Sequence, residues 1–136
     1  MRIFLGGTCN ESRWRDRLVE NLDKNILWFN PVVADWTSEC MVSELRERAE
    51  CDFCLYVITP LMTGVYSIAE VIDDSNKRPK KTVFCYLEVD GERAFTAGQR
   101  RSLDQVGKMV VRNGGTWIGL SLKSVADFFN KLVGER

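Results

Sequence analysis

Met62-Thr-Gly-Val-Tyr-Ser-Ile-Ala-Glu-Val-Ile-Asp-Asp-Ser-Asn76 is the stretch around which the rest of the chain is organised. It follows a continuous apolar run, Phe53–Ile58, and a helix breaker, Thr59-Pro60. This order predicts a buried strand, then a loop that carries Gly64, and then a helix. In an open α/β sheet, ligands bind at the carboxyl ends of the strands, where the following helices begin. The stretch therefore predicts both the fold class and the position of a ligand site.

Glu70 lies in the first turns of this predicted helix. The helix dipole favours a carboxylate there, so we expect Glu70 to be ionised at neutral pH and to have the charge that a nucleophile needs. A helical wheel gives an alternative, because Glu70 lies nearly opposite the apolar face. That face consists of Val65, Ile68, Ala69, Val71 and Ile72. On this alternative, Glu70 is a solvent-exposed structural residue.

The composition indicates one globular domain, residues 1–136. The chain has 136 residues, of which 45% are hydrophobic and 28% charged, with 19 basic and 19 acidic residues. The balanced charge gives no electrostatic reason to expect nucleic acid or an anionic membrane as a partner. No apolar run approaches the roughly 20 residues that span a bilayer, and no signal peptide is visible. We therefore expect a cytoplasmic protein.

The sequence contains no histidine and five cysteines. The lack of histidine excludes Ser-His-Asp and Cys-His catalysis and leaves proton transfer to carboxyl, lysine, cysteine or tyrosine side chains. Cys51-Asp-Phe-Cys54 is a C-x-x-C match, but it lies between a helix and a strand, whereas a thioredoxin-type motif begins a helix. A zinc site would have to use the scattered Cys9, Cys40 and Cys85. We expect buried, reduced cysteines and neither a metal ion nor a cofactor.

Strands and helices are predicted to alternate along the whole chain. The strands are expected at 2–5, 26–29, 53–58, 82–87 and 116–118, and the helices at 12–22, 38–51, after Gly64, at 99–112 and around 125–133. This alternation predicts an α/β fold with helices on both faces of a parallel sheet. A flavodoxin-like, doubly wound, five-stranded sheet with strand order 2-1-3-4-5 fits best, and it brings the ends of strands one and three together.

Local signals define the ends of these elements. Ser12 and Ser38 are the expected N-caps of the first two helices. The segment from Glu88 to Gly98 is polar and is expected to be irregular, long enough for a lid or a subunit contact.

Glycines follow both central strands. Gly6-Gly7-Thr8 comes after the first strand, and two glycines let backbone N–H groups approach a ligand closely. Met62-Thr63-Gly64 comes after the third strand, so the predicted topology places both loops on one crevice. Neither a G-x-G-x-x-G spacing nor a P-loop lysine is present.

Two further segments contain candidate site residues. Asp35 and Trp36 place an acid beside an aromatic ring that could cover a planar ligand; alternatively, the Trp is packed and the Asp exposed. Glu44 lies beside the predicted apolar stripe of its helix, where a carboxyl group is a candidate for a raised pKa. The alternative is a charged flank in which Glu44 pairs with Arg48. That stripe consists of Met41, Leu45 and Ala49.

Three segments resemble the nucleoside 2-deoxyribosyltransferase superfamily, and most closely its small bacterial and phage proteins described as nucleoside 2-deoxyribosyltransferase-like. They are Gly6-Gly-Thr-Cys-Asn10, Phe29-Asn-Pro-Val-Val33 with Asp35-Trp36-Thr37, and Gly64-Val-Tyr-Ser-Ile-Ala-Glu-Val71. The resemblance covers about Arg2 to Leu87.

The resemblance implies roles for individual residues. Glu70 occupies the place of the glutamate that attacks C1′ of a nucleoside. Glu44 occupies the place of a second acid, eight residues before Asp52, with Glu instead of the usual Asp. The implied substrate-binding residues are Gly6, Gly7, Thr8, Asn10, Asp35, Trp36, Thr63, Gly64 and Tyr66.

The chain departs from the superfamily pattern at two positions. Phe4 replaces a tyrosine that is frequent in the first strand, and Gly64 replaces a polar residue six positions before the nucleophile. The hydroxyl contact near the nucleophile is therefore missing, and the sugar or phosphate contacts made at the second position are in doubt.

The implied reaction is cleavage or transfer of the N-glycosidic bond of a (deoxy)nucleoside or nucleotide through a covalent glycosyl-glutamate. The alternatives are a non-catalytic nucleotide-binding sensor and a NAD glycohydrolase. A short chain builds only a shallow crevice, and the relatives complete their sites with a neighbouring subunit. We therefore expect a homo-oligomer, with the Glu88–Gly98 segment or the following helix near the contact.

Overall fold

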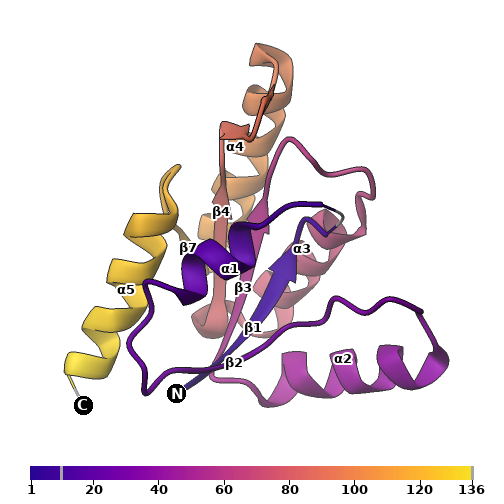
Figure 1. Ribbon diagram of the computed structural model, residues 1–136. Coiled ribbons are helices and arrows are strands. Elements are labelled where there is room, and N and C mark those ends of the chain that lie inside the picture. Colours follow the sequence, from indigo (N-terminus) through magenta and orange to yellow (C-terminus); the bar gives the residue numbers. More distant parts are fainter. Residues whose placement is uncertain (10, 136) are drawn as a thin grey trace.

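A five-stranded parallel sheet forms the centre of the protein. The computed structural model describes residues 1–9 and 11–135. The strand order is β2-β1-β3-β4-β7 (Figure 1). The bounds are Arg2–Gly7 for β1, Leu27–Phe29 for β2, Phe53–Ile58 for β3, Thr82–Tyr86 for β4 and Thr116–Trp117 for β7. Because β7 is the fifth predicted strand, the α/β fold class and the flavodoxin-like order 2-1-3-4-5 are confirmed.

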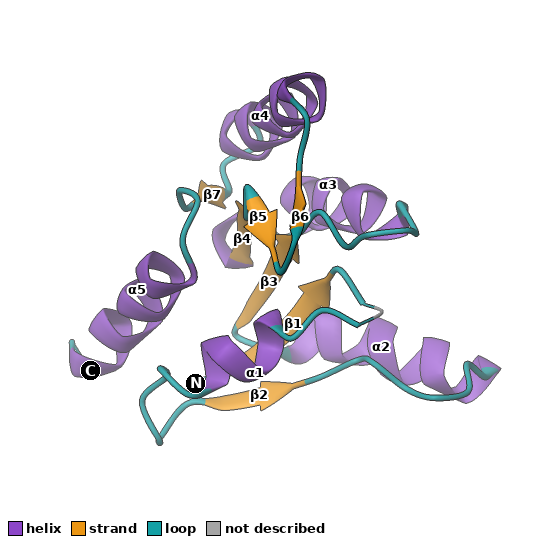
Figure 2. Ribbon diagram, turned by 45° about the horizontal axis from the view of Figure 1, so that its top comes forward, coloured by secondary structure: helices purple, strands orange, loops and turns teal. Residues whose placement is uncertain are grey.

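Helices cover both faces of this sheet, as predicted (Figure 2). The bounds are Trp14–Val19 for α1, Ser38–Glu50 for α2, Tyr66–Lys77 for α3, Ala97–Arg112 for α4 and Leu122–Gly134 for α5, with a 3-10 turn at Pro79–Lys81. Successive strand residues point to opposite faces, so β1 contributes Leu5 to one core and Phe4 to the other. The first core packs against α1 and α5, and the second against α3 and α4.

The first two helices begin differently from the prediction. The residue before α1 is Arg13, which makes no capping hydrogen bond; the hydroxyl of Ser12 accepts from the N–H of Trp14 at 3.4 Å and donates to Asp90. The cap of α2 is Thr37, whose Oγ1 accepts from the N–H of Cys40 at 3.3 Å, one residue before the predicted Ser38. The first difference involves a partner remote in the sequence, whereas the second shifts a local cap by one residue.

The Glu88–Gly98 segment is not irregular throughout. It contains an antiparallel hairpin, β5 (Val89–Asp90) and β6 (Arg93–Ala94). Gly91, with φ of 60°, is the first of the two residues between the strands, where two-residue hairpin turns require a positive φ. The expectation of irregular structure was therefore wrong for the residues of this hairpin.

The expected apolar stripe of α2 is not buried. Met41 is 51% and Leu45 52% exposed, and Ala49 is also exposed. The buried residues of α2 are instead Glu47 and Arg48. Figure 1 shows the N-terminal end of α2 extending away from the sheet.

Within the described part of the chain, no helix has both the length and the apolar character needed to cross a membrane.

Candidate active site

A pocket of about 840 Å³ opens at the carboxyl ends of β1 and β3, where the topology predicts a ligand site. This volume lies in the range of roughly 300–1,000 Å³ that is usual for small-molecule sites. The candidate residues that line it are Gly6, Gly7, Thr8, Trp36, Glu44, Thr63, Gly64, Tyr66 and Glu70. Asp35 is exposed on the loop before α2 and is not among the described lining residues. Asn10 lies outside the described residues.

The glycine loop is shaped by close packing between the two central strands. Gly7 has φ of +119°, and a Cβ built on it would lie 2.1 Å from the carbonyl oxygen of Val57. The N–H of Thr8 donates to the same carbonyl at 2.9 Å, and Thr8 Oγ1 accepts from the N–H of Thr59 at 2.8 Å. These contacts fix the ends of β1 and β3 together at the base of the pocket.

Glu70 is buried against α2. Its residue is only 8% exposed, and its Oε2 lies 3.4 Å from Nη1 of Arg48. The alternative of a solvent-exposed structural glutamate is therefore wrong. A helical wheel identifies only the face of α3 that meets the sheet. The face that carries Glu70 is covered by Arg48 of α2, which the wheel does not show.

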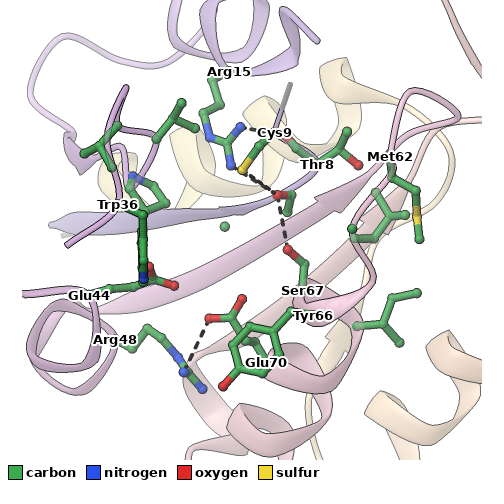
Figure 3. Close-up of a pocket in the computed structure, with 18 of the residues that line it drawn as sticks. Thr8, Cys9, Arg15, Trp36, Glu44, Arg48, Met62, Tyr66, Ser67 and Glu70 are labelled. Carbon is green, nitrogen blue, oxygen red and sulfur yellow. Dashed lines mark hydrogen bonds and ion pairs between the residues drawn. The ribbon is translucent and has the colours of Figure 1, made fainter. Parts of the chain in front are cut away.

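Glu70 and Glu44 form a coupled pair of carboxyl groups. Both point into the same part of the pocket (Figure 3). Burial, the hydrogen bond with Glu44 and the charge of Glu44 together raise the pKa of Glu70 from 4.5 to about 8. Arg48 opposes this rise. At neutral pH the unliganded pair therefore holds a proton.

The expectation that the helix dipole keeps Glu70 ionised was wrong for the unliganded site. The dipole acts mainly within the first turn of a helix, and Glu70 is the fifth residue of α3. Burial and a second carboxyl group outweigh it.

Arg48 connects Glu70 to a buried polar network. Its Nε and Nη2 each lie 3.1 Å from the carboxylate of Asp74, and Nη2 also lies 3.1 Å from Asp73. The hydroxyl of Tyr56 donates to Asp74. Burial lowers the pKa of Arg48, but the hydrogen bonds with Asp74 and the neighbouring negative charges outweigh it and raise that pKa above its usual range. Arg48 thus pairs with carboxylates of α3, rather than with Glu44 as the charged-flank alternative required.

A second buried arginine lines the other side of the pocket. Arg15 is 6% exposed, and its guanidinium donates to the carbonyl oxygens of Leu5 at 2.9 Å, Thr8 at 2.7 Å and Gly7 at 3.4 Å. Burial lowers the pKa of Arg15.

Sequence reasoning did not identify either arginine as a site residue. The spacing of four residues between Glu44 and Arg48 places both on one helix face and was a usable signal. Nothing in the sequence distinguished Arg15 from Arg13 and Arg17 on the same short helix.

The two departures from the superfamily pattern lie in different surroundings. Phe4 is fully buried, stacks on Phe29 with ring centroids 5.9 Å apart, and is not among the described lining residues. Gly64 lies on the pocket wall, and no atom lies within 4 Å of a Cβ built on it. The pocket is thus open at Gly64, which leaves room for a ligand.

All five cysteines are free thiols. The thiols of Cys51 and Cys54 are buried and donate to Glu47 at 3.4 Å and to the carbonyl oxygen of Arg48 at 3.2 Å. Burial raises the pKa of both thiols to about 12, so neither is a thiolate at neutral pH.

The fold and the pocket define a small, flavodoxin-like α/β protein with two coupled carboxyl groups at the topological switch point of its sheet. Residues 1–88 match the family model described as nucleoside 2-deoxyribosyltransferase like, so the chain belongs to this family. Family membership indicates nucleoside deoxyribosyltransferase-like activity and binding of a nucleoside. No curated protein matches the chain.

Proposed function

We propose that the protein cleaves or transfers the N-glycosidic bond of a (deoxy)nucleoside or nucleotide, with Glu70 as the nucleophile and Glu44 as the general acid and base. The observation that carries this proposal is the pair of carboxyl groups lining the pocket, in which the buried Glu70 hydrogen-bonds with the half-buried Glu44 and has a raised pKa. Two carboxyl groups in unlike surroundings are sufficient for this chemistry, and no histidine is needed.

The first step depends on which carboxyl group carries the proton. In the reactive form the proton lies on Glu44 and Glu70 is ionised. Glu70 then attacks C1′, the C1′–N bond breaks, and Glu44 gives its proton to the departing base. The products are a glycosyl ester on Glu70 and a free base.

The second step reverses these roles. An acceptor base or a water molecule attacks C1′, Glu44 accepts its proton, and the C1′–O bond to Glu70 breaks. Transfer and hydrolysis differ only in this acceptor. Arg48 supports both steps because its charge stabilises the ionised form of Glu70.

The pocket wall suits a planar base. Trp36, Met41 and Leu45 line it from α2 and the preceding loop, and Met62 lines it from the loop after β3. An aromatic ring and flexible thioethers form a surface against which different bases can pack.

Incubation with a mixture of nucleosides and nucleotides, with and without a free acceptor base, tests the proposal. Chromatography should show a released base, and a new nucleoside when an acceptor is present. Release of nicotinamide from NAD alone would favour the glycohydrolase alternative. Binding without any release of base would favour the sensor alternative and contradict the proposed activity.

Glu44→Gln should impair only the protonation step. Turnover should fall by about 10²–10⁴ on substrates with a poorly leaving base and by much less on activated ones. For the wild type, kcat/KM should fall as the pH rises through about 8, because the carboxyl pair then loses its last proton. This alkaline fall should disappear in the variant. A uniform loss on all substrates, with the alkaline fall retained, would contradict the role of Glu44.

The homo-oligomer remains a prediction, and exposed apolar side chains support it. Val42 of α2 is 64% exposed, and Met41 and Leu45 of the same helix are also exposed, so α2 presents apolar side chains that a second chain could cover. Light scattering at micromolar concentration should give a mass above that of one chain.

Two substitutions locate the contact. Val42→Glu should reduce the mass to that of one chain if α2 forms the contact. Val111→Glu, at a residue of α4 that is 53% exposed, should do so if the contact lies on the helix predicted from the sequence. A single-chain mass for the wild type would contradict the oligomer.

A further inference from the structure

The pocket contains two buried arginines with very different partners. Arg48 is surrounded by the carboxylates of Glu70, Asp73 and Asp74. Within residues 1–9 and 11–135 Arg15 makes no salt bridge; its guanidinium donates to three uncharged backbone carbonyl groups and also hydrogen-bonds with Cys9. Buried charges are usually paired, but no carboxylate of the described residues lies in salt-bridge contact with Arg15.

The lowered pKa of Arg15 agrees with this description. Burial lowers it, and the neighbouring groups, among them Cys9 and Glu44, only partly compensate. The pKa of Arg48 is shifted in the opposite direction by its acidic partners. Both arginines are buried, 6% and 4% exposed, but only Arg48 has carboxylate partners in salt-bridge contact within the described residues.

The guanidinium of Arg15 is held in place but has donor capacity left. Nε and Nη1 make short bonds of 2.9 and 2.7 Å to Leu5 and Thr8. Its third bond, from Nη2 to the carbonyl oxygen of Gly7, is long at 3.4 Å. The Arg15 guanidinium also lies over the ring of Trp14, 4.5 Å from its centroid. An arginine that is fixed in this way loses little entropy when an anion binds.

Three weak donors meet near this guanidinium. Besides Nη2 of Arg15, the hydroxyl of Ser67 donates to the carbonyl oxygen of Gly7 at 3.2 Å, and the thiol of Cys9 does so at 3.6 Å. All three distances are at the long end of their ranges, so the bonds are weak and the donors can turn to a better acceptor. All three residues line the pocket.

We propose that Arg15, with Ser67, forms an anion-binding end of the pocket and that the ligand is a phosphorylated nucleoside. This inference rests on the proposed function and adds the class of substrate. Figure 3 shows Arg15 beside Cys9 on the side of the pocket away from Arg48 and Glu70. The pocket thus has a cationic end for a phosphate and a carboxyl end for C1′ and the base. A mononucleotide and a dinucleotide such as NAD share this chemistry.

Isothermal titration calorimetry with matched ligands tests the inference without requiring turnover. The ligands are the deoxynucleosides, their 5′-monophosphates and NAD. Wild-type protein should bind a monophosphate or NAD at least about tenfold more tightly than the matched nucleoside, the scale of one charge-assisted contact. Inorganic phosphate should compete with the phosphorylated ligand, and the preference should decrease at high salt.

Arg15→Met should remove this preference, measured as the ratio of the two affinities within the same variant, so that a general change in the pocket cancels. Arg17→Met is the matched control, because Arg17 lies on the same helix, pairs with Asp90 at 3.5 Å and is not among the described lining residues. It should keep the full preference. Arg15→Lys, which keeps the charge, should retain part of it and is the second variant if Arg15→Met does not fold.

The outcomes separate this inference from the proposed function. Equal wild-type affinity for nucleosides and phosphorylated nucleosides, or no binding of any phosphorylated ligand, overturns the anion site even if both arginine variants are unfolded. A preference that survives Arg15→Met also overturns it. Binding that depends on Arg15 without any release of base supports the anion site and contradicts only the catalytic proposal. Tighter binding of NAD than of every mononucleotide identifies the dinucleotide as the source of the phosphate.

Discussion

Glu70→Gln is expected to lower turnover by at least about a thousandfold, the scale seen when a covalent catalyst loses its nucleophile. Glutamine keeps the size of the side chain but does not form the glycosyl ester. The measurement is the rate of base release at equal protein concentration. Glu50→Gln, at an exposed residue of α2, is the matched control and should keep wild-type turnover. Wild-type turnover in Glu70→Gln would show that another group attacks C1′.

The same substitution should change the pH dependence of stability. Below about pH 4.5, Glu70 is protonated in both the folded and the unfolded chain. Between 4.5 and about 8 it is ionised only in the unfolded chain, so the free energy of unfolding falls as the pH rises. The fall contributed by this group is at most about 1.4 kcal/mol per pH unit.

Glu70→Gln removes this fall because glutamine does not titrate. Thermal unfolding between pH 5 and 9 should therefore show a flatter profile for the variant than for the wild type. Folding itself should be retained, since the side chain is neutral at pH 7 in both proteins. A wild-type profile that does not fall in this window would contradict the raised pKa of Glu70.

Arg48→Met is expected to have the largest effect on stability. It removes the cation from a site where Asp74 is fully buried and Glu70 nearly so. Breaking a buried ion pair by removing one partner typically costs about 3–5 kcal/mol. Urea unfolding at pH 8 should show this loss. Because Arg48 opposes the rise in the pKa of Glu70, that pKa should also increase further in the variant.

Arg13→Met is the matched control for this loss. The side chain of Arg13 is 80% exposed, and it pairs with Asp16 at 3.4 Å. Exposed pairs contribute less than about 1 kcal/mol. If the two variants unfold at similar urea concentrations, the network around Arg48 does not stabilise the fold as described.

The fold could be predicted because its signals are local. Each strand, such as Phe53–Ile58, is an apolar run that ends at a turn residue, and each major helix has its own periodicity. Five alternations leave few ways to build a sheet, because crossover connections between parallel strands are nearly always right-handed. The hairpin at Val89–Ala94 was missed because its strands have two residues each, although the glycine of its turn, Gly91, was visible.

The sequence alone therefore determined the fold class, the strand order and the crevice between the loops after β1 and β3. Its resemblance to a known family also selected Glu70 and Glu44. Only the tertiary structure decided the electrostatic state of the site. Arg48 lies 22 residues before Glu70, and the carbonyl groups around Arg15 belong to the end of β1 and the loop after it. Burial and charge depend on such packed neighbours, and no periodicity within one helix specifies them. For this reason a glutamate that the wheel places on the solvent side of α3 is a buried acid with a pKa of about 8.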